Sequence, residues 1–412
     1  KEMRERVSAL VGDEGEEVWV STFHSMCARI LRRDIEKLGY TRSFTIYDDD
    51  DQTAVIKEVL KQLNIDDKIL PVKEIKSKIS DAKDKLLSPD EWFSQSERDF
   101  RAQMFHDVYS AYERKLRSSN ALDFDDLLMR TLELFADHPP VLESYRNRFS
   151  YVHADEYQDT NFAQYSLVKL LTSESRNLCV VGDDDQSIYG WRGAQISNIL
   201  DFESFFPNPT VIKLEENYRC TRQVLDCANA LIKHNAGRRE KTLRTNKDGE
   251  YPVRLMAMPG SQEEAEFIAD EIEQIRARNS LPWEAFAILF RANAQSRALE
   301  MAMRERHIPY RMVGTKSFFD RREVKDMLSY LQMMDNPDAD LHLLRVLNTP
   351  PRGISPNTAT FAIDWSRDNK KSIWATLLDL SFLAECSTRS QNSINAFTEL
   401  ITRYGTEFAE SE

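Results

Sequence analysis

The chain has 412 residues, more than one hydrophobic core ordinarily accommodates, so its length predicts two to four domains. Its 41% hydrophobic and 30% charged residues are ordinary for a globular protein and exclude wholesale disorder. The net charge of -13 excludes binding of nucleic acid through the overall field, so such binding would need local basic grooves and stacking aromatic side chains.

The composition also indicates where the protein works. No apolar run approaches the ~20 residues that a membrane helix needs, and residues 1–6 are charged rather than apolar as in a signal peptide. The five cysteines are scattered and form no Cys-x-x-Cys pair. We therefore expect a cytoplasmic protein with no membrane segment, disulfide framework or structural zinc site.

The first half of the chain combines strand and helix patterns. A short β-branched run at 18–22 precedes a helical pattern over 23–38. Residues 48–118 have helical periodicity throughout and no glycine, which indicates a small all-helical part. The apolar runs at 149–154 and 177–181 then predict buried strands, each ending at a polar cluster.

The second half repeats this order. Apolar runs predict strands at 210–214, 253–257 and 286–290, which alternate with helical patterns over 219–236, 261–279 and 295–306. From about residue 318 the pattern is helical. Strand followed by helix, repeated, is typical of parallel sheets, which bind ligands at the carboxyl ends of their strands. The sequence thus predicts an α/β fold with two sheet domains, each carrying a helical insertion.

A run of polar residues, Asp155-Glu-Tyr-Gln-Asp-Thr-Asn161, directly follows the strand predicted at 149–154. Paired acids at the end of a strand suit phosphoryl transfer, because one carboxylate can hold Mg²⁺ while the other orients and deprotonates the attacking water. A lone Asp-Glu pair is more often part of a solvated turn. The complete heptapeptide after an apolar strand favours phosphoryl transfer.

A second polar segment, Val180-Val-Gly-Asp-Asp-Asp-Gln-Ser-Ile-Tyr-Gly-Trp-Arg-Gly-Ala194, begins on the strand predicted at 177–181. A tryptophan beside an arginine can hold an unpaired base, with the ring stacked on the base and the guanidinium on phosphate or base. The alternative is an acidic turn whose Tyr189 and Trp191 pack in the core, as aromatic side chains more often do.

A third segment, Leu214-Glu-Glu-Asn-Tyr-Arg-Cys220, follows the first strand of the second predicted sheet domain. An arginine that reaches across from a neighbouring domain can neutralise charge on a γ-phosphate. By itself Asn-Tyr-Arg is a weak signal, because an arginine at a helix start is usually solvated.

Together these segments resemble superfamily 1 DNA helicases of the UvrD/Rep/PcrA type, most closely the PcrA members, over essentially all 412 residues. The resemblance extends to Ser21-Thr-Phe-His-Ser25, Leu122-Asp-Phe-Asp-Asp126, Phe290-Arg-Ala-Asn-Ala-Gln-Ser296, Gly314-Thr-Lys-Ser-Phe-Phe-Asp-Arg-Arg-Glu323 and Asn348-Thr-Pro-Pro-Arg-Gly353. Several long motifs in the right order are more specific than any one of them.

The resemblance implies two RecA-like parallel-sheet domains, both incomplete, each with an all-helical insertion. The first RecA-like domain would comprise 1–46 and 119–212, with 47–118 as its helical insertion. The second would comprise 213–317, with 318–412 as the first part of its insertion.

The resemblance also implies a nucleotide site for ATP and Mg²⁺. Asp155 would hold the Mg²⁺ and Glu156 would activate water. Gln186 would sense the γ-phosphate and couple it to DNA. Tyr218 would stack on the adenine, and Arg219 would be the arginine finger.

The implied activity is ATP-driven 3′→5′ movement along single-stranded DNA, coupled to closure of the cleft between the sheet domains. The expected partners are single-stranded DNA and single/double-strand junctions, and we expect a monomer that serves DNA repair or replication. The residues expected to line the single-strand path are Thr22, His24, Phe124, Tyr189, Trp191, Arg192, Arg291 and Asn293.

One expected motif does not occur in the 412 residues. A P-loop, Gly-x-x-x-x-Gly-Lys-Ser/Thr, cradles phosphates with backbone N–H groups and a lysine. None of the 12 glycines precedes a lysine, and no two lie five apart. In this family the motif lies upstream of a segment like 1–7, so we expect a chain truncated at both ends that does not hydrolyse ATP alone.

Two alternatives stay open. The chain could be a non-catalytic single-strand-binding module, or a partner subunit of a chain that supplies the P-loop. It could also be the helicase part of a helicase–nuclease, although no nuclease cluster occurs in the sequence. The complete set of phosphate-facing groups, including Gln186 and Arg219, favours the helicase.

Overall fold

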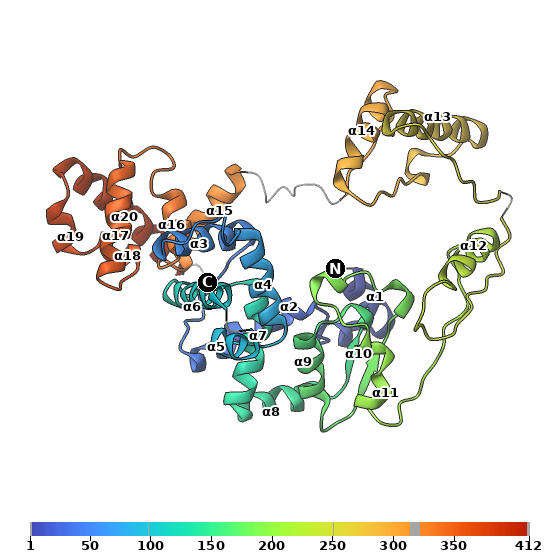
Figure 1. Ribbon diagram of the computed structural model, residues 1–412, viewed down its shortest axis with the longest axis horizontal. Coiled ribbons are helices and arrows are strands. Elements are labelled where there is room, and N and C mark those ends of the chain that lie inside the picture. Colours follow the sequence, from blue (N-terminus) through green and yellow to red (C-terminus); the bar gives the residue numbers. More distant parts are fainter. Residues whose placement is uncertain (1, 98, 250, 314–321, 410–412) are drawn as a thin grey trace. The chain divides into compact units, whose positions relative to one another are not determined.

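The computed structural model describes residues 2–97, 99–249, 251–313 and 322–409. The chain forms two compact units (Figure 1). The first comprises Lys1–Val211, Gly237–Arg239 and Asp326–Glu412, and the second comprises Ile212–Ala236 and Glu240–Lys325. Most of the predicted motif at 314–323 lies outside the described residues.

Two short parallel ladders lie in the first unit. β3 (Val152–Ala154) pairs with β4 (Leu178–Val180), with Ala154 opposite Val180. These strands confirm the predictions for 149–154 and 177–181, with shorter bounds. β1 (Thr45–Ile46) pairs with β2 (Ala121–Leu122).

Helices supply most of the core beside these ladders. The β-branched run at 18–22 forms no strand with any described residue. Val20 N–H donates to the Val18 carbonyl in a turn, and Thr22 then caps α2. Buried apolar side chains of α2 and α7, such as Ile30 and Leu128, belong to one hydrophobic core. The helical elements of this part are α1 (Glu2–Val11), η1 (Gly12–Glu16), α2 (Phe23–Asp34), η2 (Ile35–Leu38), α7 (Phe124–Asp137), α8 (Pro139–Arg148), η3 (Tyr157–Asp159), α9 (Phe162–Thr172), η4 (Asp184–Gln186), η5 (Gly190–Arg192), α10 (Ser197–Leu200) and α11 (Phe202–Phe205).

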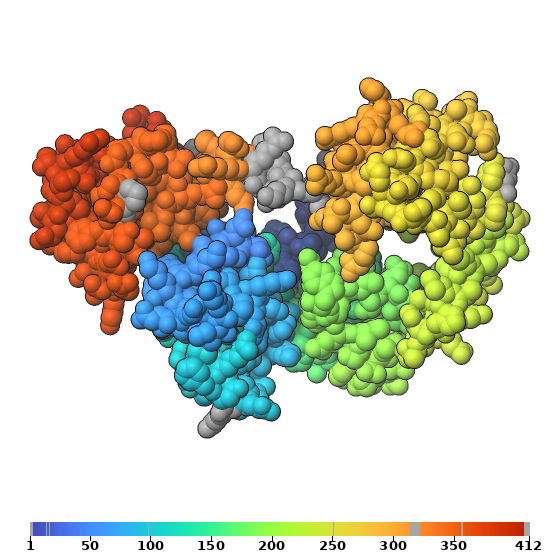
Figure 2. All heavy atoms as spheres, turned by 45° about the horizontal axis from the view of Figure 1, so that its top comes forward, coloured from blue at the N-terminus to red at the C-terminus, as the bar shows by residue number. Residues whose placement is uncertain are grey.

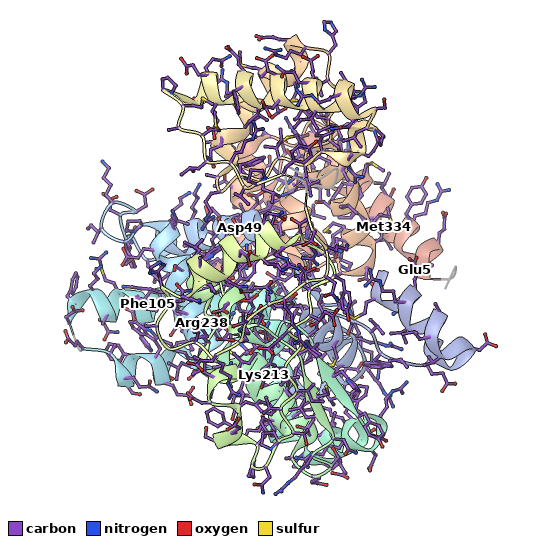
Figure 3. The ribbon with its side chains drawn as sticks, turned by 90° about the vertical axis from the view of Figure 1, so that its right-hand side faces the viewer. Glu5, Asp49, Phe105, Lys213, Arg238 and Met334 are labelled. Atoms are coloured by element: carbon purple, nitrogen blue, oxygen red, sulfur yellow. The ribbon has the colours of Figure 1, made fainter. Side chains whose placement is uncertain are left out.

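The segment between β1 and β2 is all-helical, as its periodicity predicts. It comprises α3 (Asp49–Gln62), α4 (Val72–Asp84), α5 (Pro89–Gln95) and α6 (Phe100–Ser118). Asp48 caps α3 by accepting the N–H groups of Asp50 and Asp51, and Asp51 accepts the N–H of Asp48 in return. Buried side chains such as Phe105, labelled in Figure 3, form a separate apolar core.

A buried ion cluster joins this helical segment to α7. The Lys83 Nζ atom of α4 lies 2.7 Å from Asp123, 2.8 Å from Glu113 and 2.9 Å from Asp126. Arg130 supplies a second cation beside Glu113 and Asp126. Burial alone would lower the pKa of Lys83, but the three carboxylates together raise it well above its usual range. The cluster therefore holds Lys83 charged although its side chain is fully buried.

A second helical segment also belongs to the first unit. Its buried Asn336 donates to the Thr45 hydroxyl at 3.0 Å, and Asp340 lies 3.1 Å from Lys115. These contacts dock it against the segment between β1 and β2, as Figure 2 shows in orange against blue. Its helices are α15 (Arg322–Asp335), α16 (Asp340–Val346), α17 (Pro356–Asp368), α18 (Ile373–Leu377), α19 (Leu380–Glu385) and α20 (Thr388–Ala409).

The second unit has the predicted helices but not the predicted strands. α12 (Arg222–Ile232), α13 (Ser261–Asn279) and α14 (Ser296–Glu305) match the helical patterns, and η6 (Trp283–Ala285) and η7 (Asn293–Gln295) lie between the last two. Apolar residues of α13 and α14, such as Ala269 and Met303, form its core.

The strand predictions for 210–214, 253–257 and 286–290 are wrong for this structure. Among the described residues of this unit the only ladder contact is an isolated bridge between Glu216 and Arg244. Leu255 is 97% exposed and Leu289 94% exposed. A strand needs a paired backbone, and none of these extended runs forms a ladder with a described residue. The runs 210–214 and 253–257 also lack a buried face, whereas Ile288 of the third run packs partly buried against the core of α13 and α14. Within the described part of the chain, no helix is both long and apolar enough to span a membrane.

We predict that Lys83→Met lowers the free energy of unfolding by about 3–5 kcal/mol, because it removes the cation shared by three carboxylates and leaves buried Asp123 without one. Urea denaturation followed by circular dichroism measures this change. The matched control is Lys76→Met on the same helix, which breaks the pair with exposed Asp49 and should cost about 0–1 kcal/mol. Equal losses of unfolding free energy in Lys83→Met and Lys76→Met would contradict the stabilising role of the buried ion cluster.

Candidate functional site

The acids predicted to face phosphate lie where β3 ends. Asp155 and Glu156 are exposed, and no cation pairs with either of them among the described residues. Glu156 has a left-handed backbone (φ 52°), and its N–H donates to the Asp155 carboxylate at 3.0 Å. This conformation is costly for a residue other than glycine and is found preferentially at functional sites.

The loop that carries Gln186 leaves the neighbouring strand at the same edge. Because β3 and β4 are parallel, residues 155–156 and 181–182 emerge side by side, and Tyr157 N–H donates to the Val181 carbonyl at 3.0 Å. In the loop, the Gln186 carboxamide donates to Asp183 at 2.7 Å. The fold thus brings Gln186 and the two acids to one edge of the sheet.

Two arginines that the sequence analysis missed contact this loop. Arg238, labelled in Figure 3, binds Asp185 through two hydrogen bonds, Nε to Oδ1 at 2.8 Å and Nη2 to Oδ2 at 2.6 Å. The Arg239 N–H donates to Asp184 at 2.9 Å. Bidentate Arg–carboxylate pairs fix orientation as well as charge. The two adjacent arginines can be seen in the sequence. No local sequence pattern, however, shows that they pair with acids more than fifty residues away.

The predicted base-stacking group is exposed. Trp191 is 68% exposed, and its ring centroid lies 6.3 Å from that of Tyr189. The Arg192 guanidinium lies 4.7 Å from the Trp191 ring. The alternative that these aromatic side chains pack in the core is therefore wrong. An exposed ring with an adjacent guanidinium is chemically suited to an unpaired base and its phosphate.

Three other residues predicted for the DNA path gather at two helix starts. Thr22 caps α2 by accepting the Ser25 N–H at 3.2 Å. The His24 ring lies edge-on to Phe124, the first residue of α7, with centroids 5.8 Å apart. Burial lowers the pKa of His24, so the ring is neutral near pH 7. Half of the Phe124 surface stays exposed.

The remaining predicted residues belong to the second unit. Tyr218 and Arg219 are exposed, and the Asn217 carboxamide accepts the Arg219 N–H at 2.9 Å. Arg291 and Asn293 lie at a turn in which Gln295 accepts the Arg291 N–H at 3.0 Å. These hydrogen bonds shape the backbone at each motif and leave the side chains exposed.

An acidic residue of the helical segment between β1 and β2 contacts the segments that follow β3 and β4. Asp84, at the end of α4, accepts from the Asn161 carboxamide. A Cβ atom at Gly193 would lie 2.4 Å from the Asp84 carboxylate, and Gly193 has φ +79°. The left-handed conformation favours glycine at 193, and a side chain there would displace the Asp84 carboxylate.

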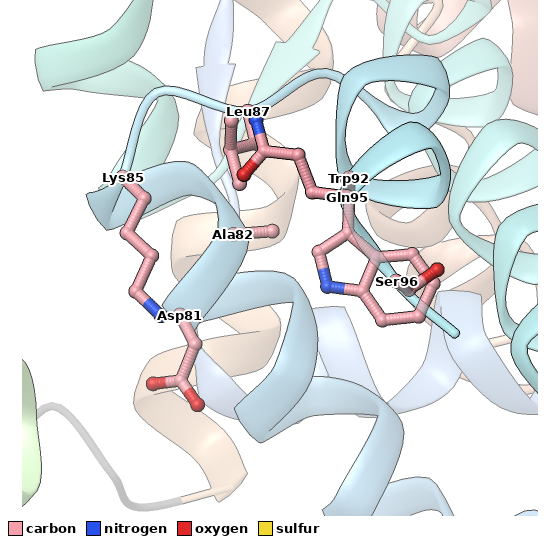
Figure 4. A pocket seen from close by; sticks show the side chains of 7 residues that line it. All are labelled: Asp81, Ala82, Lys85, Leu87, Trp92, Gln95 and Ser96. Atoms are coloured by element: carbon pink, nitrogen blue, oxygen red, sulfur yellow. The ribbon is translucent and has the colours of Figure 1, made fainter.

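A pocket of about 200 Å³ also lies on the helical insertion, between α4 and α5. Figure 4 shows Trp92 facing Ala82 and Leu87 across it. None of the residues predicted from the sequence to bind nucleotide or DNA lines this pocket. The geometry of the strand ends and their loops, not a deep cavity, marks the candidate site.

Acids after one parallel strand, an amide-bearing loop after the next and exposed aromatic side chains beyond it are features of nucleotide-binding α/β proteins that handle nucleic acid. The family model of the UvrD/REP helicase N-terminal domain matches residues 1–207. That of the UvrD-like helicase C-terminal domain matches residues 212–407. The chain belongs to the UvrD/REP helicase family, and these matches confirm the predicted class of two RecA-like α/β domains.

Known relatives agree with the family. The chain is 48% identical over 403 residues to the ATP-dependent DNA helicase PcrA of Staphylococcus aureus, a match that covers 97% of this chain and 54% of that protein. It is 46% identical over 401 residues to the protein of the same name from Staphylococcus epidermidis, covering 97% and 55%. The chain thus spans about half the length of these relatives.

We predict that stability falls as the pH rises between about 4 and 8. Burial, with Asp81 nearby and Lys85 opposing, raises the pKa of Asp84 to about 7. Burial, with Asp123 and Asp84, raises that of Asp125 to about 8, while Ser80 and Lys83 oppose the rise. In this window the folded protein keeps protons that the unfolded chain releases, so each group lowers the unfolding free energy by at most about 1.4 kcal/mol per pH unit.

Urea denaturation across this pH range measures the slope. Asp84→Asn and Asp125→Asn, which mimic the protonated acids, should flatten it. Asp67→Asn, an exposed acid of the same helical segment, is the control and should keep the wild-type slope. A wild-type slope in both buried-site variants would contradict the prediction.

Proposed function

We propose that the chain is the nucleotide- and DNA-handling part of an ATP-dependent 3′→5′ DNA helicase, which couples hydrolysis to movement along single-stranded DNA. One observation carries this proposal. The single loop after β4 contains Gln186 beside the acids and, within six residues, the exposed rings of Tyr189 and Trp191. A change at a phosphate can therefore reach a DNA base through one short segment.

Asp155 is the proposed ligand of Mg²⁺. Its carboxylate is exposed at a strand end and meets no cation among the described residues, which suits a hard divalent ion with oxygen ligands. When bound, Mg²⁺ would neutralise charge on the phosphate oxygens. Asp155 also accepts the Glu156 N–H, so the backbone of the next residue is oriented by the same carboxylate.

Glu156 is proposed to orient the attacking water and take its proton, and Gln186 to hydrogen-bond the γ-phosphate. On the second unit, Tyr218 would stack on the adenine and Arg219 would neutralise charge on the γ-phosphate. Exposure of both side chains leaves them available to a ligand.

The proposed single-strand path uses stacking and local charge, which suits a chain with a net charge of -13. Trp191 and Tyr189 supply exposed rings, and Phe124 with His24 supplies a second aromatic pair. The other residues proposed for this path are Thr22, Arg192, Arg291 and Asn293.

The domain division predicted from the sequence is also a proposal: 1–46 with 119–212, 47–118, 213–317 and 318–412. In the structure, Asp326–Glu412 groups with the first unit. We propose that this segment is nevertheless the insertion of the second domain. We further propose a cytoplasmic monomer that acts on single-stranded DNA and single/double-strand junctions.

We predict that the 412 residues alone do not hydrolyse ATP, because they contain no P-loop to position the triphosphate. A phosphate-release assay with single-stranded DNA tests this. Joined to an upstream P-loop segment of a family member, the chain should gain DNA-stimulated hydrolysis. In that protein Glu156→Gln should lower the rate by roughly 10²–10⁴-fold while nucleotide binding persists.

DNA-stimulated hydrolysis in the joined protein would exclude a non-catalytic binding module. No hydrolysis, with single-strand binding retained, would instead favour that module or a partner subunit. Unchanged hydrolysis in Glu156→Gln would remove Glu156 from its proposed role.

We predict that Trp191→Ala weakens single-strand binding by about 1–3 kcal/mol, the value of one stacked base. Fluorescence anisotropy with a labelled oligonucleotide measures this on the 412-residue chain. The control is Tyr151→Ala, an exposed aromatic residue at the opposite end of β3 from Asp155. Equal affinity of Trp191→Ala and wild type would exclude Trp191 from the DNA path.

A further inference from the structure

The side chain of Gln158 lies between the two acids and the loop of Gln186. It belongs to η3 and is 1% exposed. Its Nε2 atom donates to the Glu156 carboxylate at 2.8 Å, and its Oε1 atom accepts the Asp183 N–H at 3.0 Å. One buried carboxamide therefore joins the polar turns that follow β3 and β4.

The chemistry of its neighbours fixes which way this carboxamide faces. A carboxylate only accepts and a backbone N–H only donates, so the amide nitrogen must face Glu156 and the oxygen must face Asp183. Glutamine offers this donor and this acceptor at any pH near neutrality. An ionised glutamate would set two carboxylates against each other, and a methionine would offer no donor and only a weak acceptor.

The hydrogen bonds continue from Asp183 to the predicted phosphate sensor. The Asp183 carboxylate accepts from the Gln186 carboxamide at 2.7 Å and from the Asp185 N–H at 3.1 Å. The Gln186 N–H donates to the Asp183 carbonyl at 2.9 Å. An unbroken path thus runs from the Glu156 carboxylate through Gln158 and Asp183 to Gln186.

The backbone at Gly182 passes close to the Gln158 side chain. A Cβ atom at Gly182 would lie 2.6 Å from Gln158 Oε1 and 2.7 Å from a methyl carbon of Ile199. A side chain at 182 would therefore displace the Gln158 carboxamide from its present position. The Ser187 hydroxyl also donates to the Gln158 carbonyl at 3.3 Å.

We propose that Gln158 is a positioning residue that orients the Glu156 carboxylate and links it to Gln186, so that the water-activating group and the phosphate sensor move together. This inference rests on the proposed function, because it concerns the same hydrolysis. If Gln158 had only a structural role, its substitution would lower the stability of the protein. The rate of hydrolysis would then fall only as far as the loss of folded protein explains.

The kinetic test compares Gln158→Met and Gln158→Glu in the chain joined to a P-loop segment. Gln158→Met should lower kcat by about 10–100-fold, the usual cost of losing a partner that orients a functional ligand, with KM for ATP within about twofold. In Gln158→Glu, repulsion between carboxylates should move the acid limb of the pH–rate profile to higher pH.

The control is Gln164→Met. Gln164 accepts the Asn161 N–H at 3.0 Å in a capping box of α9, so it is a hydrogen-bonded glutamine close to the motif in sequence but outside the path. It should lower stability with little change in kcat. If Gln158→Met and Gln164→Met have the same kcat, the inference is overturned. Absence of hydrolysis in the wild-type joined protein would instead overturn the proposed function.

A second measurement uses the 412-residue chain and needs no hydrolysis. Glutamine-selective ¹⁵N labelling gives side-chain amide signals, which Gln158→Met and Gln186→Met assign by their loss. Glu156→Gln should shift the Gln158 signal, and Gln158→Met should shift the Gln186 signal, whereas Gln164→Met should shift neither. An unmoved Gln186 signal in a folded Gln158→Met protein would refute the path.

Discussion

The parallel pairing of β3 with β4 is the constraint on which the candidate site depends. The ladder is only three residues long on each strand, yet it sets Ala154 opposite Val180, so the chain segments beyond them leave one edge together. The acids follow one strand and the loop of Gln186 follows the other. Beyond so short a ladder the turns share few backbone hydrogen bonds, such as that from Tyr157 N–H to the Val181 carbonyl. Side chains therefore also hold these turns: Gln158 from within, and Arg238 from a distant segment.

The helical segment between β1 and β2 also contacts the candidate site. Two adjacent residues at the end of α4 face different functional motifs. Lys83 neutralises Asp123 and Asp126, which form the capping box that begins α7 at Phe124. Asp84 contacts Asn161 and approaches Gly193, in the loop that carries Tyr189 and Trp191. A displacement of α4 would therefore act on both aromatic groups proposed to contact DNA, which gives this insertion a route to the site through packing and buried charge.

Local patterns in the sequence predicted local structure well. Helical periodicity placed α13 at its observed bounds and predicted the all-helical segment over 48–118. The apolar runs before Asp155 and Gly182 predicted β3 and β4. The same kind of run failed in the second unit, where the residues around Leu255 and Leu289 are extended but unpaired. Apolar composition records a tendency to be buried, whereas a strand also requires a partner with free backbone groups.

The sequence by itself determined the family, the α/β class and the identity of the candidate catalytic and DNA-contacting residues, because motif order and residue chemistry are written along the chain. Only the tertiary structure decided which of these residues meet within the first unit, and that Gln158, Arg238 and Asp84 hold them. These are contacts between residues brought together by strand pairing and helix packing, in two cases across more than fifty positions, and no local spacing encodes them. The docking of Asn336 against Thr45, across 291 positions, has the same physical origin.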